Sequence, residues 1–161
     1  MTEIKRSYIK NSTIRVKNMP LLKDALETLE ESELKITERR VQMIEIMYQK
    51  NRYLSAKEVK AELENSYPGI SPDTIYRNLH SFSELNILEE TEFNGERFFR
   101  ANCGIDEHHH HFICTKCGRS IELSMCPLTY FKDEIKGAEV TSHRFELFGI
   151  CENCLKKRVV N

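Results

Sequence analysis

The chain has 161 residues, of which 40% are hydrophobic and 30% are charged, so it is long enough for one or two small domains with compact cores. Its formal net charge of −1 excludes a uniformly basic surface that would bind nucleic acid through bulk charge. The sequence has no long apolar run and no apolar signal-peptide core near its start, so we expect no membrane partner and a cytoplasmic location.

Charge is distributed unevenly along the chain. Residues 1–20 carry five basic residues and one acidic residue, whereas residues 21–100 carry 11 basic and 16 acidic residues. We expect residues 1–20 to form a basic flexible arm. This arm is either a plain tail or a segment that contacts DNA phosphates.

Hydrophobic spacing and capping residues predict four helices in the first half of the chain. They cover about residues 21–33, 37–50, 55–65 and 71–85. Thr37 is the expected N-cap of the second helix, and Ser55 with Glu58 forms a capping box at the third. The fourth begins with the N-cap Ser71 and with Pro72 at its first helical position.

The fourth helix has polar side chains near its N-terminal end, where a helix-turn-helix protein contacts base edges in the major groove. The candidate DNA contacts on this helix are Thr74, Tyr76, Arg77 and Asn78. Basic residues near the start of the second helix are candidates for phosphate contacts. They are Lys35, Arg39 and Arg40. For both sets the alternative is an ordinary solvent-exposed helix face.

A β-hairpin is expected after the fourth helix. Two strand-like segments, at about residues 87–93 and 96–100, flank Asn94-Gly95. Asn-Gly is the strongest two-residue signal for a hairpin turn. Helices followed by such a hairpin predict a winged helix, and we expect the aromatic residues of its wing to pack rather than to contact DNA.

Cysteine and histidine are concentrated in the last 59 residues, which contain all six cysteines and five of the six histidines. Two Cys-x-x-Cys pairs in this part predict a tetrahedral structural zinc site. The ligands would be Cys114, Cys117, Cys151 and Cys154. The alternatives are a pair of disulfides, which would suit an exported chain, or a thiol redox motif, which would need only one pair.

Four consecutive histidines, His108 to His111, precede the first cysteine pair. If this run is a strand, its side chains alternate between two faces. His109 and His111 would share one face and His108 and His110 the other, so one run could serve two metal sites. The alternatives are an expression-tag remnant or a solvated polar stretch, but the run is internal and continues into two apolar residues.

The remaining segments predict a small α+β domain, in which zinc contributes to folding. Short strands are expected at residues 112–113 and 121–123, a helix at 127–135 and a strand at 140–150. The expected fold class of the whole chain is α+β. It consists of an N-terminal winged helix-turn-helix followed by this small zinc-containing unit.

These segments together resemble the ferric uptake regulator family over about residues 20–156. The resemblance rests on residues 71–79, on the histidine run with the first cysteine pair, and on residues 148–154. Within the family the chain looks most like the zinc uptake regulators. The resemblance implies a homodimeric repressor of double-stranded operator DNA, with a DNA-binding domain over residues 21–101 and a dimerisation domain over residues 102–161.

The resemblance also implies three metal sites. The four cysteines of the two pairs match structural zinc ligands. A regulatory site between the domains falls on Glu89, Cys103, His109 and His111, with Glu122 as an alternative ligand. A third site falls on His108, His110 and His143. The usual carboxylate of this third site would fall on Thr129, which cannot serve, and the available substitutes are Cys126 and Asp133.

Cys103 favours zinc as the sensed metal, because a thiolate ligand shifts preference towards Zn²⁺. Its alternative is a buried cysteine without a ligand role. Three other functions compete: an iron or peroxide sensor of the same family, a zinc enzyme, and a zinc-ribbon interaction module. The sequence lacks a His-Glu-x-x-His motif and has enough ligands to close every site, so we expect neither an enzyme nor a small-molecule substrate.

Overall fold

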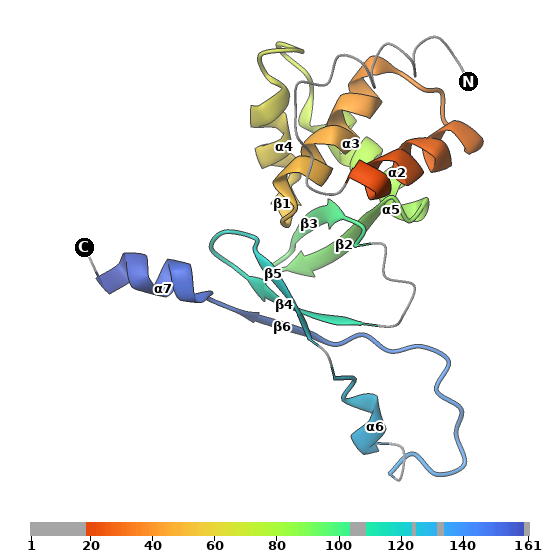
Figure 1. Ribbon diagram of the computed structural model, residues 1–161, viewed down its shortest axis with the longest axis vertical. Coiled ribbons are helices and arrows are strands. Elements are labelled where there is room, and N and C mark those ends of the chain that lie inside the picture. The colour runs from red at the N-terminus through yellow and green to blue at the C-terminus, as the bar shows by residue number, and fades with distance from the viewer. Residues whose placement is uncertain (1–18, 104–108, 124, 132–133, 160–161) are drawn as a thin grey trace.

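The computed structural model describes residues 19–103, 109–123, 125–131 and 134–159 (Figure 1). Most of the expected basic arm, residues 1–18, lies outside the described residues. Four helices and a three-stranded sheet come first, and a second three-stranded sheet with two short helices follows. This arrangement confirms the expected α+β class.

All four helices predicted in the first half are present. They are α2 (Met19–Glu31), α3 (Glu38–Lys50), α4 (Ala56–Leu63) and α5 (Pro72–Glu84). The Thr37 side chain accepts a hydrogen bond from the Arg40 backbone, and Ser55 with Glu58 forms the complete capping box. Ser71 caps α5. Capping side chains satisfy backbone N–H groups that have no partner inside a helix, which fixes where each helix begins.

One hydrophobic core lies between these helices and the first sheet. Side chains with 0% exposure come from α3, α4, α5 and β3, and they include Met43, Ile44, Met47, Val59, Leu63, Ile75, Leu79, Phe82 and Phe99. Six residues of α3 are buried, because this helix contacts α2, α4 and β3. Helix α5 is therefore held by its apolar face, and its N-terminal turn stays accessible.

The first sheet contains the predicted hairpin. Strands β2 (Leu88–Phe93) and β3 (Glu96–Ala101) pair antiparallel, and β1 (Leu54–Ser55) adds to β3. Asn94 and Gly95 both have positive φ, 53° and 76°, as a tight hairpin turn of this length requires. The predicted winged helix is confirmed; the two-residue strand β1 was not predicted, because two residues carry no periodicity.

The second sheet has the order β5-β4-β6. Its strands are β4 (His110–Cys114), β5 (Ser120–Leu123) and β6 (Glu146–Gly149). Strand β5 pairs antiparallel with β4, and β6 pairs parallel with it. The predicted strand over residues 140–150 was too long. Residues 140–145 lie outside any strand, because the pairing with β4 begins only at Glu146.

The helices of the second half also differ from the sequence expectation. Helix α6 is described over Leu128–Phe131, inside the helix expected over residues 127–135, and residues 132–133 lie outside the described residues. Figure 1 shows it on a segment that extends away from the second sheet. Helix α7 (Glu152–Val159) was not predicted. It has an acidic residue in its first turn and basic residues in its last, which complements the helix dipole.

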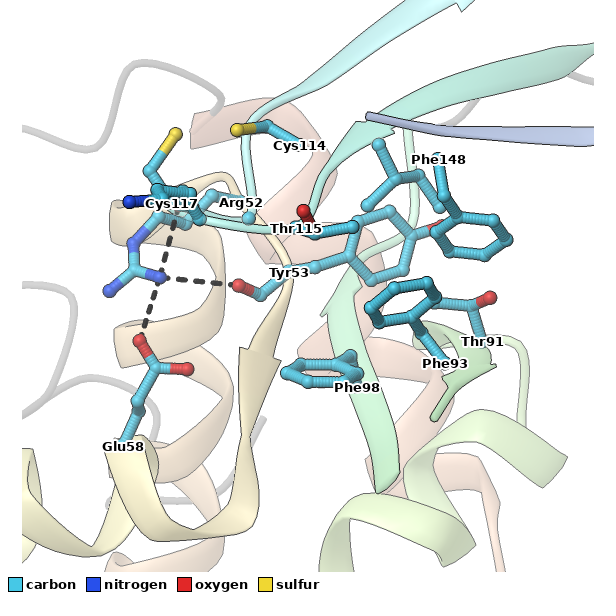
Figure 2. Close-up of a pocket in the computed structure, with 13 residues that line it drawn as sticks. Arg52, Tyr53, Glu58, Thr91, Phe93, Phe98, Cys114, Thr115, Cys117 and Phe148 are labelled. Atoms are coloured by element: carbon cyan, nitrogen blue, oxygen red, sulfur yellow. Dashed lines mark hydrogen bonds and ion pairs between the residues drawn. The ribbon is translucent and has the colours of Figure 1, made fainter. Parts of the chain in front are cut away.

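The cysteine turn that follows β4 docks onto the first sheet (Figure 2). The Tyr53 backbone N–H donates to the Gly118 carbonyl at 2.8 Å. Arg52 Nη1 donates to the Cys117 carbonyl at 3.3 Å and to Glu58 at 2.9 Å. A cavity of about 70 Å³ lies beside these contacts. The first cysteine pair is therefore in direct contact with the winged helix.

The wing itself packs against β6. The rings of Phe93 and Phe148 stack with their centroids 4.9 Å apart. Thr91 Oγ1 donates to Glu146 Oε2 at 2.8 Å, and Thr91 is only 1% exposed. Phe93 and the buried Phe99 thus bear out the expectation that the wing's aromatic side chains pack. This wing serves as a contact between the two sheets.

Gly118→Ala should lower the free energy of unfolding by roughly 2–5 kcal/mol, the sum of a left-handed backbone penalty and overpacking. Gly118 has a φ of +69°, and an added Cβ would lie 2.0 Å from the Tyr53 carbonyl oxygen. Gly95→Ala is the matched control, because its φ is +76° and nothing lies within 4 Å of the added Cβ. Chemical denaturation of the two variants and the wild type measures both effects; equal losses would show that the contact with Tyr53 is unimportant.

Candidate metal centres

Histidine and cysteine side chains form three groups within the described residues, and the ligand atoms of each group lie within 4.8 Å of one another. The groups are Cys114, Cys117, Cys151 and Cys154; Cys103, His109 and His111; and His110, Cys126 and His143. No residue belongs to two groups. Each group has a donor set suited to a transition metal of the zinc type.

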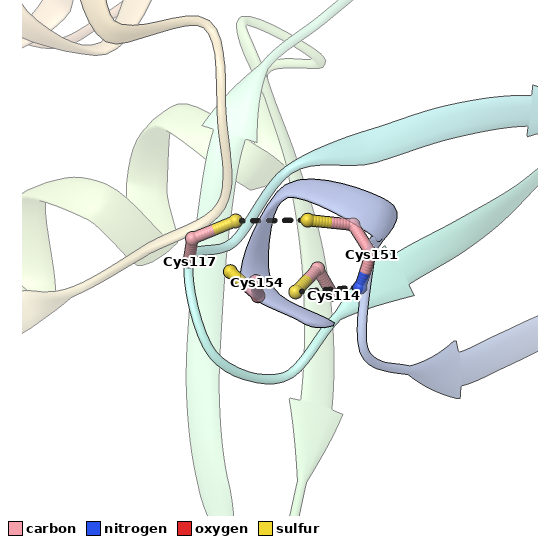
Figure 3. A group of neighbouring side chains, drawn as sticks. All are labelled: Cys114, Cys117, Cys151 and Cys154. Atoms are coloured by element: carbon pink, nitrogen blue, oxygen red, sulfur yellow. Dashed lines mark hydrogen bonds between the residues drawn. The ribbon is translucent and has the colours of Figure 1, made fainter. Parts of the chain in front are cut away.

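The four-cysteine group closes the end of the second sheet (Figure 3). Cys114 ends β4, Cys117 lies in the turn after it, and Cys151 and Cys154 lie where β6 leads into α7. The Sγ atoms of Cys117 and Cys151 are 3.7 Å apart. The four side chains are thiols rather than disulfides, so the disulfide alternative does not describe this structure. The arrangement brings all four predicted ligands together.

The pKa values of these thiols indicate how a bound cation would stabilise the group. Burial opposes ionisation of Cys114, but hydrogen bonds from three backbone N–H groups outweigh it and lower its pKa to about 6. Hydrogen bonding with Cys117, together with burial, raises the pKa of Cys154 to about 12. The first thiolate therefore forms readily and the last does not. Four adjacent thiolates need a central dication, which is the chemistry of a Cys₄ zinc site.

The second group, which we call the hinge group, consists of Cys103, His109 and His111 and lies between the two sheets. Cys103 follows β3, and the two histidines lie at the start of β4. Cys103 Sγ is 2.9 Å from His109 Nε2, and the imidazole rings of His109 and His111 have centroids 4.8 Å apart. Three of the four ligands expected here are thus within mutual reach.

The fourth expected ligand, Glu89 on β2, lies beside the hinge group. Its Oε1 accepts a hydrogen bond from the Cys103 backbone at 3.2 Å and is 3.8 Å from His109 Nε2. Its Oε2 is 3.8 Å from His111 Nδ1. The carboxylate therefore faces both imidazoles, although it falls outside the set whose ligand atoms all lie within 4.8 Å. Tyr53 also contacts it, with its hydroxyl 3.4 Å from Oε2.

The alternative ligand Glu122 is the cross-strand partner of His111 on β5. Directly opposite residues place their side chains on the same face of a sheet. Burial lowers the pKa of His111, while Glu89 opposes this effect and Glu122 opposes it more weakly. His111 is therefore neutral near pH 7, and a neutral imidazole is the form that binds a metal.

The third group lies on the opposite face of β4. Cys126 Sγ is 3.0 Å from His143 Nε2, and the rings of His110 and His143 have centroids 5.1 Å apart. Two residues considered for this site, His108 and Asp133, lie outside the described residues. The Thr129 hydroxyl donates to the Cys126 carbonyl, so it turns back towards its own chain segment. Cys126 was expected only as a substitute ligand. In this structure it supplies the donor that a carboxylate was expected to supply in the third group.

The candidate DNA-contacting residues differ in their solvent exposure and in the contacts they already make within the protein. Arg77 is exposed and forms an ion pair with Asp73 one turn before it. Asn78 accepts a hydrogen bond from Arg40 Nε at 2.8 Å, which joins α5 to α3. Tyr76 is half-buried, with its ring edge against Phe99. The other candidates are Lys35 and Arg39, which are exposed, and Thr74, which is half-buried. The exposed cations are the most accessible of the set, while Tyr76 and Asn78 also support the fold.

This combination of a winged helix, a cysteine-closed sheet and a hinge group has clear relatives. The model of the ferric uptake regulator family matches residues 31–148. The chain belongs to the ferric uptake regulator family. The ferric uptake regulation protein of Staphylococcus epidermidis is 42% identical over 134 residues, which cover 83% of this chain and 96% of that protein. The Staphylococcus aureus protein of the same name is 44% identical over 131 residues, covering 81% and 96%.

Solved structures agree with this assignment. The ferric uptake regulator of Francisella tularensis with iron has a TM-score of 0.62 at 26% identity, covering 78% of this chain and 97% of that one. A zinc uptake regulator complexed with zinc and DNA has a TM-score of 0.66 at 20% identity, covering 90% and 99%, and shows the shared fold alone. The expected family is confirmed, and membership makes the chain a metal-responsive regulator. The zinc branch stays a prediction.

The sequence contains no long apolar run, and the helices can be compared with this observation. Across the part of the chain that the structure describes, none is both long enough and apolar enough to span a bilayer.

Cys151→Ser should remove one tightly bound zinc per chain, because it takes away a buried member of the four-cysteine group. Zinc binding by such a site contributes directly to folding, so the variant should also unfold at a lower temperature. Metal analysis after dialysis against a mild chelator, with thermal unfolding, measures both. Cys126→Ser is the control and should keep this zinc; retention of it in Cys151→Ser would contradict the assignment.

Proposed function

We propose that this chain is a metal-dependent transcriptional repressor, which binds a palindromic operator as a homodimer when the hinge group holds a metal, and so controls metal-uptake genes. The observation that carries the proposal is the position of the hinge group. Cys103 follows the wing, Glu89 belongs to the wing, and His109 and His111 begin the second sheet. One ion bound by all four would join the two halves of the chain.

The residues of the hinge group can therefore set the angle between the halves. A bound divalent metal would supply a positive centre that the Cys103 thiolate, the two imidazoles and the Glu89 carboxylate can share. With these side chains drawn together, β2 and β4 keep one relative orientation. In a dimer this orientation decides whether two α5 helices are spaced for successive major grooves. The metal would thus shift a population of conformers towards the DNA-binding one.

Contacts with DNA would come from the N-terminal turn of α5 and the start of α3. The exposed Arg77 would contact a base edge or a phosphate, and Thr74 would contribute from the same turn. The exposed Lys35 and Arg39 would contact the DNA backbone. We also propose a DNA-binding domain over residues 21–101 and a dimerisation domain over residues 102–161. The arm expected over residues 1–20 must end earlier, because α2 begins at Met19. The two separate sheets support this division.

Exposed apolar side chains support the homodimer. Ile121 and Leu147 flank Phe112 in register across the second sheet, and they are 51% and 44% exposed. Other large apolar residues of this half are also exposed; they are Met125, Tyr130, Phe131, Ile135, Val140 and Leu155. A concentration of exposed apolar surface in one part of a protein is typical of an interface. A second copy of the chain is the partner that we propose.

Donor chemistry favours zinc as the sensed metal. The hinge group has one thiolate and two imidazoles, which bind Zn²⁺ more strongly than Fe²⁺. The structural zinc would occupy the four-cysteine group. We propose a third, weaker site at His110, His143 and Cys126, with His108 as a further candidate ligand. Its thiolate would also suit zinc.

Iron is the second candidate for the sensed metal. It is favoured by the two staphylococcal relatives, which are 42% and 44% identical and are named ferric uptake regulation proteins. In cells, metal availability can decide which ion fills a site, whatever the order of affinities. A site that prefers zinc would therefore hold iron wherever free zinc is kept low enough. A peroxide sensor would need iron at the same place.

Two functions of other classes have less support. A zinc enzyme keeps an open coordination position next to a general base. The four-cysteine group has four ligands, and Glu89 lies beside the three ligands of the hinge group, so these two sites have enough ligands to close. We therefore propose that the chain is not an enzyme. A zinc-ribbon interaction module would leave the winged helix and the hinge group without a role.

Cys103→Ser should abolish metal-dependent DNA binding, because a serine hydroxyl is a much poorer ligand than a thiolate for zinc. The variant should remain a folded dimer that retains the structural zinc. Mobility shifts with operator DNA, with size-exclusion chromatography and metal analysis, test this. Unchanged metal dependence in the variant would contradict the hinge assignment.

The same assay separates the two candidate metals. Titrations with Zn²⁺ in air and with Fe²⁺ under anaerobic conditions, each buffered by a chelator of known affinity, give the free concentration that half-saturates DNA binding. We expect saturation at the lower free concentration with zinc. Tighter activation by Fe²⁺ would favour the iron sensor.

Arg77→Ala should weaken operator binding by about 1–3 kcal/mol if Arg77 contacts a base edge, and it should relax specificity at that position. If Arg77 contacts a phosphate instead, the loss should be equal on specific and random DNA, with a smaller dependence on salt. Binding measured at several salt concentrations separates these outcomes. Lys23→Ala, on α2, is the control; an equal effect there would exclude a direct role for α5.

A further inference from the structure

Arg100 is a buried cation beside the hinge group. It lies on β3, is 7% exposed, and its guanidinium lies 5.7 Å from the centre of the Tyr53 ring. Arg100 Nη1 donates to His111 Nε2 at 3.0 Å and to Ser120 Oγ at 2.7 Å. One side chain of the first sheet thus holds both β4 and β5 of the second.

The burial of this guanidinium is incompletely compensated. Arg100 Nε is buried, and no described residue accepts a hydrogen bond from it. A buried charge with an unmet donor is costly, so such a residue needs a role that offsets the cost. Glu89 is the cross-strand partner of Arg100 and carries the opposite charge. Arg100 nevertheless hydrogen-bonds to an imidazole and a hydroxyl.

The hydrogen bond to His111 fixes how that imidazole is used. Arginine is always a donor, so His111 Nε2 must be the acceptor. The proton of the neutral ring is then on Nδ1, which lies 3.8 Å from Glu89 Oε2. A neutral imidazole has one lone pair. His111 can give it to Arg100 or to a metal, but not to both.

We propose that Arg100 is the internal competitor of the hinge metal. In the metal-free chain it occupies the lone pair of His111 and ties β3 to β4 and β5. A metal that takes His111 must displace the Arg100 hydrogen bond, whichever ring nitrogen it binds. If it binds Nε2 it replaces the guanidinium directly; if it binds Nδ1 the proton moves to Nε2, and two donors then face each other.

This inference rests on the proposed function, and it adds two consequences. The positive charge of Arg100 should weaken the affinity of the hinge group for a divalent cation, because like charges repel across a site with little solvent. Metal binding should also release a contact between the sheets that the metal-free protein holds. Arg100 would therefore set the metal concentration at which the conformation changes.

The test compares Arg100→Met with wild type. Methionine keeps much of the length of the side chain and removes its charge and donors. With the four-cysteine group kept full, titration of Zn²⁺ against a chromogenic chelator should show affinity for the hinge group raised by about tenfold or more, the usual scale of effects from a ligand's hydrogen-bond partner. Arg97→Met is the matched control, since Arg97 lies on the same strand and pairs with Glu90 instead. An unchanged or lower affinity in Arg100→Met would overturn the proposal.

A second measurement needs no metal at the hinge. Nitrogen NMR of the imidazoles in protein without hinge metal should show His111 with its proton on Nδ1 in wild type, and a change of that state in Arg100→Met. A proton on Nε2 in wild type would overturn the proposal, even if the variant fails to fold. If no metal binds to the hinge group of the wild type, the proposed sensing function fails. Metal binding to Arg100→Met alone would still support the competition by Arg100. Metal binding to neither protein would exclude that competition.

Discussion

Strand β4 is the element on which the metal chemistry depends, because pairing on both edges fixes the direction of every side chain in it. His111 faces the first sheet, where Cys103 and Glu89 lie, and His110 faces the other way, towards His143. A shift of one residue in register would exchange these faces. The antiparallel contact with β5 and the parallel contact with β6 together exclude such a shift. Two separate groups of metal donors can therefore come from one short run of histidines.

Contacts between the two sheets occur at several separate places, and each uses a different kind of interaction. The cysteine turn is held by backbone hydrogen bonding between Tyr53 and Gly118, and the wing packs through Phe93 and Phe148. Arg100 supplies a third, charged contact. The first two contacts need no metal at the hinge. In our proposal, the contact that Arg100 makes with His111 changes when the hinge group is occupied.

Much of the structure could be predicted where the signal is local. Thr37, Ser55 and Ser71 are helix caps because their side chains satisfy neighbouring N–H groups, and Asn94-Gly95 forms the hairpin turn. The Cys-x-x-Cys spacings predicted a four-cysteine group that the structure does bring together. Helix α7 and the true length of β6 were missed, because neither has a capping motif or a periodicity that separates it from the adjoining cysteine pair.

Non-local features were harder to foresee. No pattern in the sequence indicated that Arg100 would be buried beside His111, since a basic residue at the end of a strand normally points to solvent. The sequence offered Cys126 only as a substitute ligand, because its proximity to His143 comes from tertiary packing and not from local spacing. Sequence spacing reliably predicts that two ligands lie together when both belong to one tight turn, as in a Cys-x-x-Cys pair. It is weak for ligands that meet only through tertiary packing.

The parallel pairing of β4 with β6 has a consequence for how the protein acquires its structure. A parallel partner cannot arrive through a tight turn, so the chain must travel from Leu123 to Glu146 before the third strand is in place. Closing such a segment costs entropy and slows assembly. A metal ion held first by Cys114 and Cys117 would offer an anchor to which Cys151 and Cys154 could attach, so capture of the ion and completion of the sheet would become a single event.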